Sequence, residues 1–176
     1  RDPSKRPIAA AWHEALMRMA DQHVPCINPN CEGKAFILLR DHPAVCPWCN
    51  TRIAYPKQIP VLRLYASVGQ TGHFQQDKGR VVVWQDRELK RWHVQSGFAE
   101  QDAKSDEERA ALVKFEYDGR QGWVLHNLGL EDLRVADINR MQRVAIGAKA
   151  LLREGQKWLL GADNAARLAL VTMQSV

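Results

Sequence analysis

The sequence predicts a mainly β protein that begins with an α-helix, continues into a small cysteine-rich module and ends in a β-sandwich. Three observations predict this order. Apolar side chains recur at helical spacing within residues 7–20. All the cysteines lie between residues 26 and 49. From residue 59 onward, short apolar segments alternate with turns that contain Gly or Asp. The expected domains are residues 1–23, 24–57 and 58–176.

The cysteines form two close pairs. Four residues separate Cys26 from Cys31, two separate Cys46 from Cys49, and fourteen lie between the pairs. Each pair also encloses a proline, which favours a tight turn. Paired cysteines at this separation are typical of a tetrahedral zinc site, and four sulfur ligands without an open position favour a structural metal. The sequence therefore predicts a zinc ribbon that binds one Zn²⁺.

Other interpretations of the cysteines explain less. Two disulfides need an oxidising compartment, whereas the first residues do not resemble a signal peptide, so we expect a cytoplasmic protein. A thioredoxin-type pair would use only Cys46 and Cys49 and would leave the other two cysteines unexplained. His23 and His42 are alternative ligands, although a surface position near the ribbon is the simpler interpretation of both.

Composition limits the class of protein. A chain of 176 residues with 45% hydrophobic content has room for one good core and a small module stapled by metal. No apolar run approaches the roughly 18 residues of a membrane span, so no membrane partner is expected. The formal net charge is +5, and four zinc-bound thiolates lower it further. This modest excess, spread along the chain, argues against nucleic acid as a partner.

The sequence predicts an amphipathic helix over residues 7–20. Pro7 suits a first helical turn, where its missing N–H needs no partner. Ile8, Trp12, Leu16 and Met19 recur at spacings of four, four and three and form one apolar stripe. A helix of this length is marginal in water by itself. We therefore expect the stripe to be buried against the ribbon, the sandwich or another chain.

The same segment resembles the end of a protein kinase catalytic domain. Its Asp-Pro-Ser-Lys-Arg-Pro run, followed by a helix with Trp12 and Leu16, is similar to the D-P-x-x-R-P motif and final helix of the large lobe. The resemblance covers residues 2–16 and implies that Arg6 pairs, in a whole kinase, with a glutamate of the activation segment. That glutamate and the catalytic motifs are absent from this sequence. The resemblance thus implies a non-catalytic region that follows a kinase-like domain.

The order of motifs carries the resemblance further. A kinase end followed by a Cys-Pro-Trp-Cys ribbon resembles bacterial Ser/Thr kinases of the stress-response and tellurite-resistance type. In the ribbon itself, residues 35–39 and 51–55 are expected to be short strands, with a turn at residues 41–43. Some thirty residues bury too little apolar surface to fold alone, so the metal must supply much of the stability.

Residues 58–176 predict a β-sandwich. Many short apolar segments are separated by glycine-containing turns, such as Asp118-Gly119 and Glu154-Gly155, and residues 69–79 read as a polar loop. Residues 99–110 are charged and are expected to form a solvated loop or a short helical turn. The expected strands are residues 61–65, 80–84, 91–94, 112–117, 122–125, 133–135, 142–146, 148–152, 156–160 and 166–172.

This region resembles a forkhead-associated (FHA) domain. The resemblance rests on the Trp123–Gly129 segment, similar to a W-x-L-x-D-L-G strand and turn, and on the segments 144–147 and 151–161, similar to a later glycine-containing hairpin. It covers roughly residues 61–175. FHA domains are modules that read phosphothreonine, so the resemblance implies a protein-interaction role.

The residues that would read phosphate match the family only in part. Gly79-Arg80 stands for the arginine after a glycine, and Arg91 and His93 match the Arg and His of an S-R-x-H segment. Lys90 occupies the place of the serine, and the Asn-Gly pair is missing. We therefore expect Arg80, Arg91 and His93 to serve partner binding without requiring phosphate, through loops near residues 70–78 and 87–93.

The leading hypothesis is a non-catalytic regulatory and protein-interaction region of a bacterial Ser/Thr kinase-like signalling protein. Its partners would be proteins, such as the upstream kinase domain or co-encoded signalling proteins. The alternative is a zinc-ribbon protein that binds nucleic acid, which the pI of about 9.2 permits. An enzyme is not expected, because the sequence shows no set of nucleophile, base and orienting residue.

Overall fold

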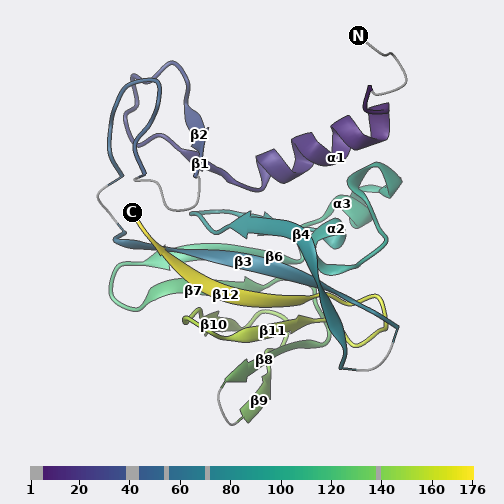
Figure 1. The fold of residues 1–176 in the computed structure, drawn as a ribbon. Coiled ribbons are helices and arrows are strands. Elements are labelled where there is room, and N and C mark those ends of the chain that lie inside the picture. The colour runs from purple at the N-terminus through teal and green to yellow at the C-terminus, as the bar shows by residue number, and fades with distance from the viewer. Residues whose placement is uncertain (1–5, 39–43, 54–55, 70–71, 138–139) are drawn as a thin grey trace.

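The computed structural model describes residues 6–38, 44–53, 56–69, 72–137 and 140–176 of the chain. It confirms a mainly β protein with an N-terminal helix and a β-sandwich (Figure 1). The helix and the cysteine-rich module lie on one side of the sandwich, beside the end of strand β4. None of the helices in the described ranges is long and apolar enough to cross a membrane.

The sandwich consists of two antiparallel sheets. The larger sheet has the order β4 (Phe74–Val82), β3 (Gln58–Ser67), β12 (Leu168–Ser175), β11 (Lys157–Leu160), β8 (Leu133–Asp137) and β9 (Arg140–Arg143). The smaller sheet has the order β10 (Lys149–Leu151), β7 (Gly122–Asn127), β6 (Val113–Asp118) and β5 (Glu88–Leu89).

The sandwich core lies between the two sheets. Side chains of β6 alternate between buried and partly exposed, as expected for a strand with one face against a core. Trp158 of β11 and Phe115 of β6 are among the largest fully buried side chains. The indole N–H of Trp123 donates to the Gln58 carbonyl at 2.9 Å and ties the smaller sheet to the start of β3. This continuous apolar core gives the sandwich a stability of its own.

The cysteine-rich module is a pair of loops on a minimal sheet. Strand β1 (His23–Pro25) pairs with β2 (Ala35–Ile37), and a single bridge joins Val45 to Arg52. The strand expected at residues 51–55 is thus reduced to this bridge over its described part. The turn expected at residues 41–43, with His42, lies outside the described residues.

The module does not have a core of its own. Its buried side chains, including Phe36 and Ile53, form one cluster with Ile59, Val61 and Val82 of the sandwich. The side chains of β3 alternate between the two faces of the sheet. One face of that strand contributes to the sandwich core, and the other contributes to this second cluster. The cysteine-rich module and the sandwich are therefore less independent as folding units than the sequence indicates.

Helix α1 (Ala9–Ala20) forms where expected, but its apolar stripe is exposed. The exposed fraction of Trp12 is 58% and that of Ile8 is 72%. The prediction that the stripe packs against the ribbon or the sandwich is wrong, because the helix is attached through its polar C-terminal end. Periodicity shows which side chains share a face, not what that face contacts.

Residues 91–94 form a short helix, α2 (Arg91–Val94), and not the expected strand. The backbone N–H of Lys90 donates to His93 Nδ1 at 2.9 Å, which caps the first turn. The charged segment after it contains the expected helical turns, η2 (Glu100–Asp102) and α3 (Asp106–Arg109). Strand β4 begins at Phe74, so the second half of the expected polar loop 69–79 is strand.

Candidate metal centre

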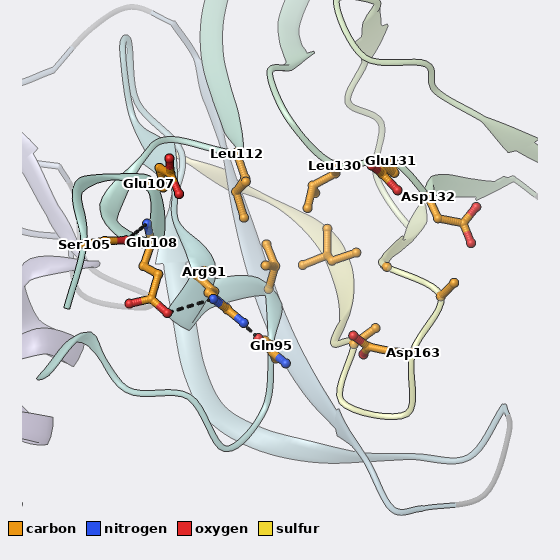
Figure 2. Close-up of a pocket in the computed structure, with 15 residues that line it drawn as sticks. Arg91, Gln95, Ser105, Glu107, Glu108, Leu112, Leu130, Glu131, Asp132 and Asp163 are labelled. Atoms are coloured by element: carbon orange, nitrogen blue, oxygen red, sulfur yellow. Dashed lines mark hydrogen bonds and ion pairs between the residues drawn. The ribbon is translucent and has the colours of Figure 1, made fainter. Parts of the chain in front are cut away.

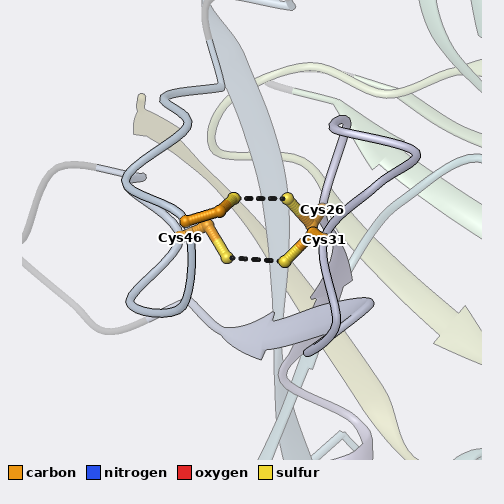
Figure 3. Close-up of side chains that lie close together, drawn as sticks. Cys26, Cys31 and Cys46 are labelled. Carbon is orange, nitrogen blue, oxygen red and sulfur yellow. Dashed lines mark hydrogen bonds between the residues drawn. The ribbon is translucent and has the colours of Figure 1, made fainter.

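The four cysteines converge on one point, as their spacing predicts. The sulfur atoms of Cys26 and Cys49 are 3.6 Å apart, and those of Cys31 and Cys46 are 3.7 Å apart (Figure 3). All four sulfurs lie within 4.8 Å of one another. A tetrahedron of sulfurs about 2.3 Å from a central ion has edges of about 3.8 Å. The observed separations fit four ligands around one ion and are far longer than the roughly 2.05 Å of a disulfide bond.

The first knuckle is shaped by backbone hydrogen bonds. The N–H of Cys26 donates to the Lys34 carbonyl at 2.7 Å, and the N–H of Cys31 donates to the Asn28 carbonyl at 3.1 Å. Lys34 adopts a left-handed conformation, with φ of 55°. Its ammonium group donates to the Pro29 carbonyl at 3.2 Å across the knuckle. These local hydrogen bonds hold Lys34 in its strained backbone conformation.

The second knuckle is tighter. The N–H of Cys46 donates to the Thr51 carbonyl at 2.9 Å, and the N–H of Asn50 donates to the Cys46 carbonyl at 2.9 Å. Asn50 has φ of 56°, the left-handed conformation that asparagine tolerates better than most residues. Figure 3 shows Cys46 pointing toward the opposite knuckle, and the sulfur of Cys49 belongs to the same cluster.

Trp48 joins the two knuckles. A Cβ atom on Gly33 would lie 2.1 Å from Trp48 Cδ1, so the indole rests directly on the glycine backbone. The indole is nevertheless 70% exposed on its other side. Only glycine permits this approach, and the sequence gives no signal that these two residues meet.

The thiols differ in their hydrogen-bonding environment. Cys49 Sγ lies 3.2 Å from Thr51 Oγ1, and the hydroxyl and backbone of Thr51 lower the pKa of Cys49 to about 6. For Cys26, a hydrogen bond from the Asn28 backbone lowers the pKa, but burial and the three other thiols together raise it to about 12. Burial, followed by the thiols of Cys49 and Cys46, raises the pKa of Cys31.

The crowding of the four thiols makes their ionisation depend on a cation. Without a cation, four adjacent sulfurs cannot all ionise, because each thiolate disfavours the next. A bound dication removes that repulsion and stabilises all four thiolates. Within the described residues, these cysteines are the one group of His, Cys, Asp or Glu side chains close enough to bind a metal ion. His23 is exposed in β1 and is not part of it.

Arg80 and His93 lie at the junction between α1 and the ribbon. Arg80 donates to Gln22 Oε1, to the Leu38 carbonyl and to Gln174 Oε1 at 3.0, 3.1 and 2.7 Å. It thus connects the end of α1, the ribbon and strand β12. His93 is 7% exposed, and its Nε2 lies 2.9 Å from Asp21 Oδ1.

Arg87, which sequence reasoning missed as a structural residue, completes this junction. It donates to the carbonyls of Ala20 and His23 at 3.3 and 2.5 Å. The backbone of Val82 also donates to the Asp21 carbonyl at 2.8 Å. Every residue from 20 to 23 is therefore hydrogen-bonded to the sandwich or the ribbon. We call residues 20–23 the junction segment.

Arg91 points away from the junction segment. Its guanidinium donates to Gln95 Oε1 at 3.0 Å and pairs with Glu108 at 3.1 Å (Figure 2). The structure thus does not bring Arg80, Arg91 and His93 to one site. Arg80 and His93 have roles within the chain, and partner binding by any of the three stays a prediction.

Comparison of the chain with family models, curated proteins and solved structures finds no match. Any proposed function therefore rests on the geometry of the cysteine cluster and on the exposed surfaces of the molecule.

Proposed function

We propose that the cysteine-rich module is a zinc ribbon in which Cys26, Cys31, Cys46 and Cys49 bind one structural Zn²⁺. Four thiolates at tetrahedral spacing suit zinc, and a full set of protein ligands leaves no open position for catalysis. Free thiols in this arrangement agree with a cytoplasmic protein, where cysteines stay reduced.

We further propose that the chain is a non-catalytic regulatory and protein-interaction region of a bacterial Ser/Thr kinase-like signalling protein of the stress-response and tellurite-resistance type. The ribbon acts as a rigid spacer and the FHA-like sandwich as the interaction module. The observation that carries this proposal is the exposed apolar stripe of α1.

The stripe is a surface that needs a partner. Four large apolar side chains lie exposed on one helix, and such a patch marks an interaction site more often than a solvated face. The C-terminal end of α1 is fixed to the sandwich by the junction segment. The helix therefore presents the stripe outward in one orientation, as a final helix of a preceding domain would require.

Phosphothreonine reading is not part of the proposal. A phosphate dianion needs several donors that converge on one point. Arg80 and His93 are engaged at the junction segment, and Arg91 is paired with Glu108. An FHA-like module with these contacts would bind protein surfaces by other means.

The test is capture of the partner by this chain and by two variants. Trp12→Glu with Leu16→Glu places charge in the stripe, and Met141→Glu with Ile146→Glu is a matched control on another exposed apolar surface. We expect a kinase-like domain to be bound by the natural chain and by the control, and at least tenfold more weakly by the stripe variant.

A partner that binds the stripe variant as tightly as the natural chain would contradict the proposal. Binding to generic duplex DNA at 0.15 M salt, with a steep salt dependence, would favour the nucleic-acid alternative. We expect no such binding, because basic and acidic residues are nearly balanced along the chain.

A further inference from the structure

A pocket of about 690 Å³ opens where the loops at one end of the sandwich meet (Figure 2). The segment containing α2 and α3 forms one wall, and the loops after β7 and β11 form the other. The pocket lies outside the metal centre and the junction segment. Its lining combines an apolar base with a charged rim.

Carboxylates outnumber basic side chains on the rim, and the guanidinium of Arg143 lies at the backbone carbonyl of Glu131 beside it. The rim contains five carboxylates and a single arginine, Arg91, among its charged side chains. Arg91 is paired with Glu108, so its charge is already neutralised. Among the carboxylates, Asp132 is also paired, with two bonds of 2.9 and 2.8 Å to Arg134.

The remaining three carboxylates belong to Glu107, Glu131 and Asp163. None of them has an ion pair with another residue in the ranges that the structure describes. They come from both walls of the pocket, with Glu107 on one side and Glu131 and Asp163 on the other (Figure 2). Their negative potential therefore faces an occupant from two sides.

The base of the pocket is apolar and held in place. Leu112 is half-buried, and Leu130 projects beside it (Figure 2). The loop that carries Leu130 is fixed by Asn127, which is fully buried. The Asn127 amide donates to the carbonyls of Leu130 and Val144 at 2.8 and 2.9 Å, and its oxygen accepts from the Leu130 N–H at 2.8 Å. The wall of the pocket that carries Leu130 is thus preformed, as the walls of binding sites usually are.

We propose that this pocket binds a cationic peptide segment of a partner protein, with basic side chains paired to Glu107, Glu131 and Asp163 and an apolar side chain against Leu112 and Leu130. Charge complementarity selects the occupant. A phosphopeptide would meet three carboxylates and no unpaired arginine, which costs affinity through like-charge repulsion. A metal ion is not the occupant, because the rim carboxylates do not converge as ligands.

The inference rests on the proposed role of the sandwich as a protein-interaction module. It names the chemistry of the segment that the module recognises. The α1 stripe and the pocket are separate surfaces, so an experiment on one does not decide the other.

The test is fluorescence anisotropy with three labelled heptapeptides and the full, zinc-loaded chain. In the first peptide arginine and leucine alternate, in the second glutamate replaces arginine, and the third carries phosphothreonine. We expect sub-millimolar binding of the first peptide alone, weakened by raising the salt concentration to 0.5 M.

A double charge reversal tests the site. Glu107→Lys with Glu131→Lys changes two exposed carboxylates whose side chains have no hydrogen bond with the residues that the structure describes, so the fold should be retained. We expect binding of the cationic peptide to weaken about tenfold, since exposed charge pairs are individually modest. Glu32→Lys, on the exposed part of the ribbon, is the control and should leave binding unchanged.

Three results would overturn the proposal. Equal binding by the double variant would place the peptide elsewhere, and preferential binding of the phosphothreonine peptide would show the opposite selectivity. Self-association abolished by the double variant would identify a second copy of this chain as the occupant. If the peptide test fails while the α1 stripe still captures a kinase-like domain, the pocket assignment falls and the proposed function stands.

Discussion

The ribbon and the sandwich are adjacent β structures that are held together by different forces. The sandwich buries large side chains such as Trp158 and Phe115 between two sheets. The ribbon has two strands of three residues each and one isolated bridge. Its buried side chains need Ile59, Val61 and Val82 of the sandwich to complete a cluster. Apolar burial is enough to hold the sandwich together, and it is not enough to hold the ribbon.

The difference shows which features of the sequence determine the path of the chain in each region. In the sandwich, the alternation of apolar residues decides which side chains face the core. In the ribbon, four sulfurs and two left-handed residues, Lys34 and Asn50, decide the path of the chain. Perturbing the sulfurs should therefore affect one region far more than the other.

The largest effect is expected from Cys46→Ser. Structural zinc contributes on the order of 10 kcal/mol of apparent binding free energy, and three sulfurs hold zinc much more weakly than four. We expect amides of residues 24–53 to lose protection in hydrogen exchange while strands β6, β7 and β11 keep theirs. The start of strand β3, where Ile59 and Val61 pack against the ribbon, should become less protected than the rest of that strand.

Glu32→Gln, at an exposed position of the ribbon, serves as a control that keeps all four sulfurs and should retain ribbon protection. Full protection of the ribbon in zinc-free Cys46→Ser would show that apolar contacts alone hold it. Loss of protection throughout the chain would show that the sandwich depends on the metal as well.

A second prediction concerns the sandwich alone. Asn127→Ala removes three buried hydrogen bonds that hold the loop after β7. We expect the free energy of unfolding of the sandwich to fall by ~2–4 kcal/mol, because the partner groups of the loop are left unsatisfied. Zinc content should not change. Chemical denaturation followed by tryptophan fluorescence measures this, with the exposed Asn164→Ala as the control.

A third, smaller effect is expected at the junction segment. Arg80→Met keeps the length of the side chain and removes its bonds to Gln22, Leu38 and Gln174. We expect a loss of ~1–3 kcal/mol and faster exchange of amides in residues 9–23. Arg63→Met, directly opposite in strand β3, is the matched control. Equal effects of the two variants would contradict a special role for Arg80.

The smallest effect is expected from Thr51→Val. The Thr51 hydroxyl stabilises the thiolate of Cys49 and lowers its pKa to about 6. Loss of the hydroxyl should raise this pKa, so that protons compete better with the metal for the sulfur. Zinc affinity should fall about tenfold, as for other groups that support metal ligands, and the loss should grow below pH 7. Competition with a chromogenic chelator at two pH values measures the change.

The sequence predicted the convergence of the four cysteines and most strands because both depend on local patterns. Cysteine spacing reports the geometry of a knuckle, and alternation reports the buried face of a strand such as β6. The left-handed conformation of Asn50 also follows from its residue type. These features need no knowledge of what lies across the fold.

The errors concern contacts between distant segments. Arg91–Val94 is a helix because a histidine caps the Lys90 backbone, which periodicity cannot reveal. The α1 stripe is exposed because polar bonds at Asp21 and Gln22 fix the helix by its C-terminal end. The acidic pocket gathers carboxylates from three segments, each more than twenty residues from the next, so no local motif marks it.

The zinc site is tested most directly by elemental analysis of the chain purified without added metal. Thiol counting on the same sample completes the measurement. We expect one zinc per chain and four thiols that react with a thiol reagent only after a chelator removes the metal. Zinc-free protein, or a chain with two disulfides that keeps its ribbon folded, would contradict the claim that a tetrahedral zinc site holds the ribbon.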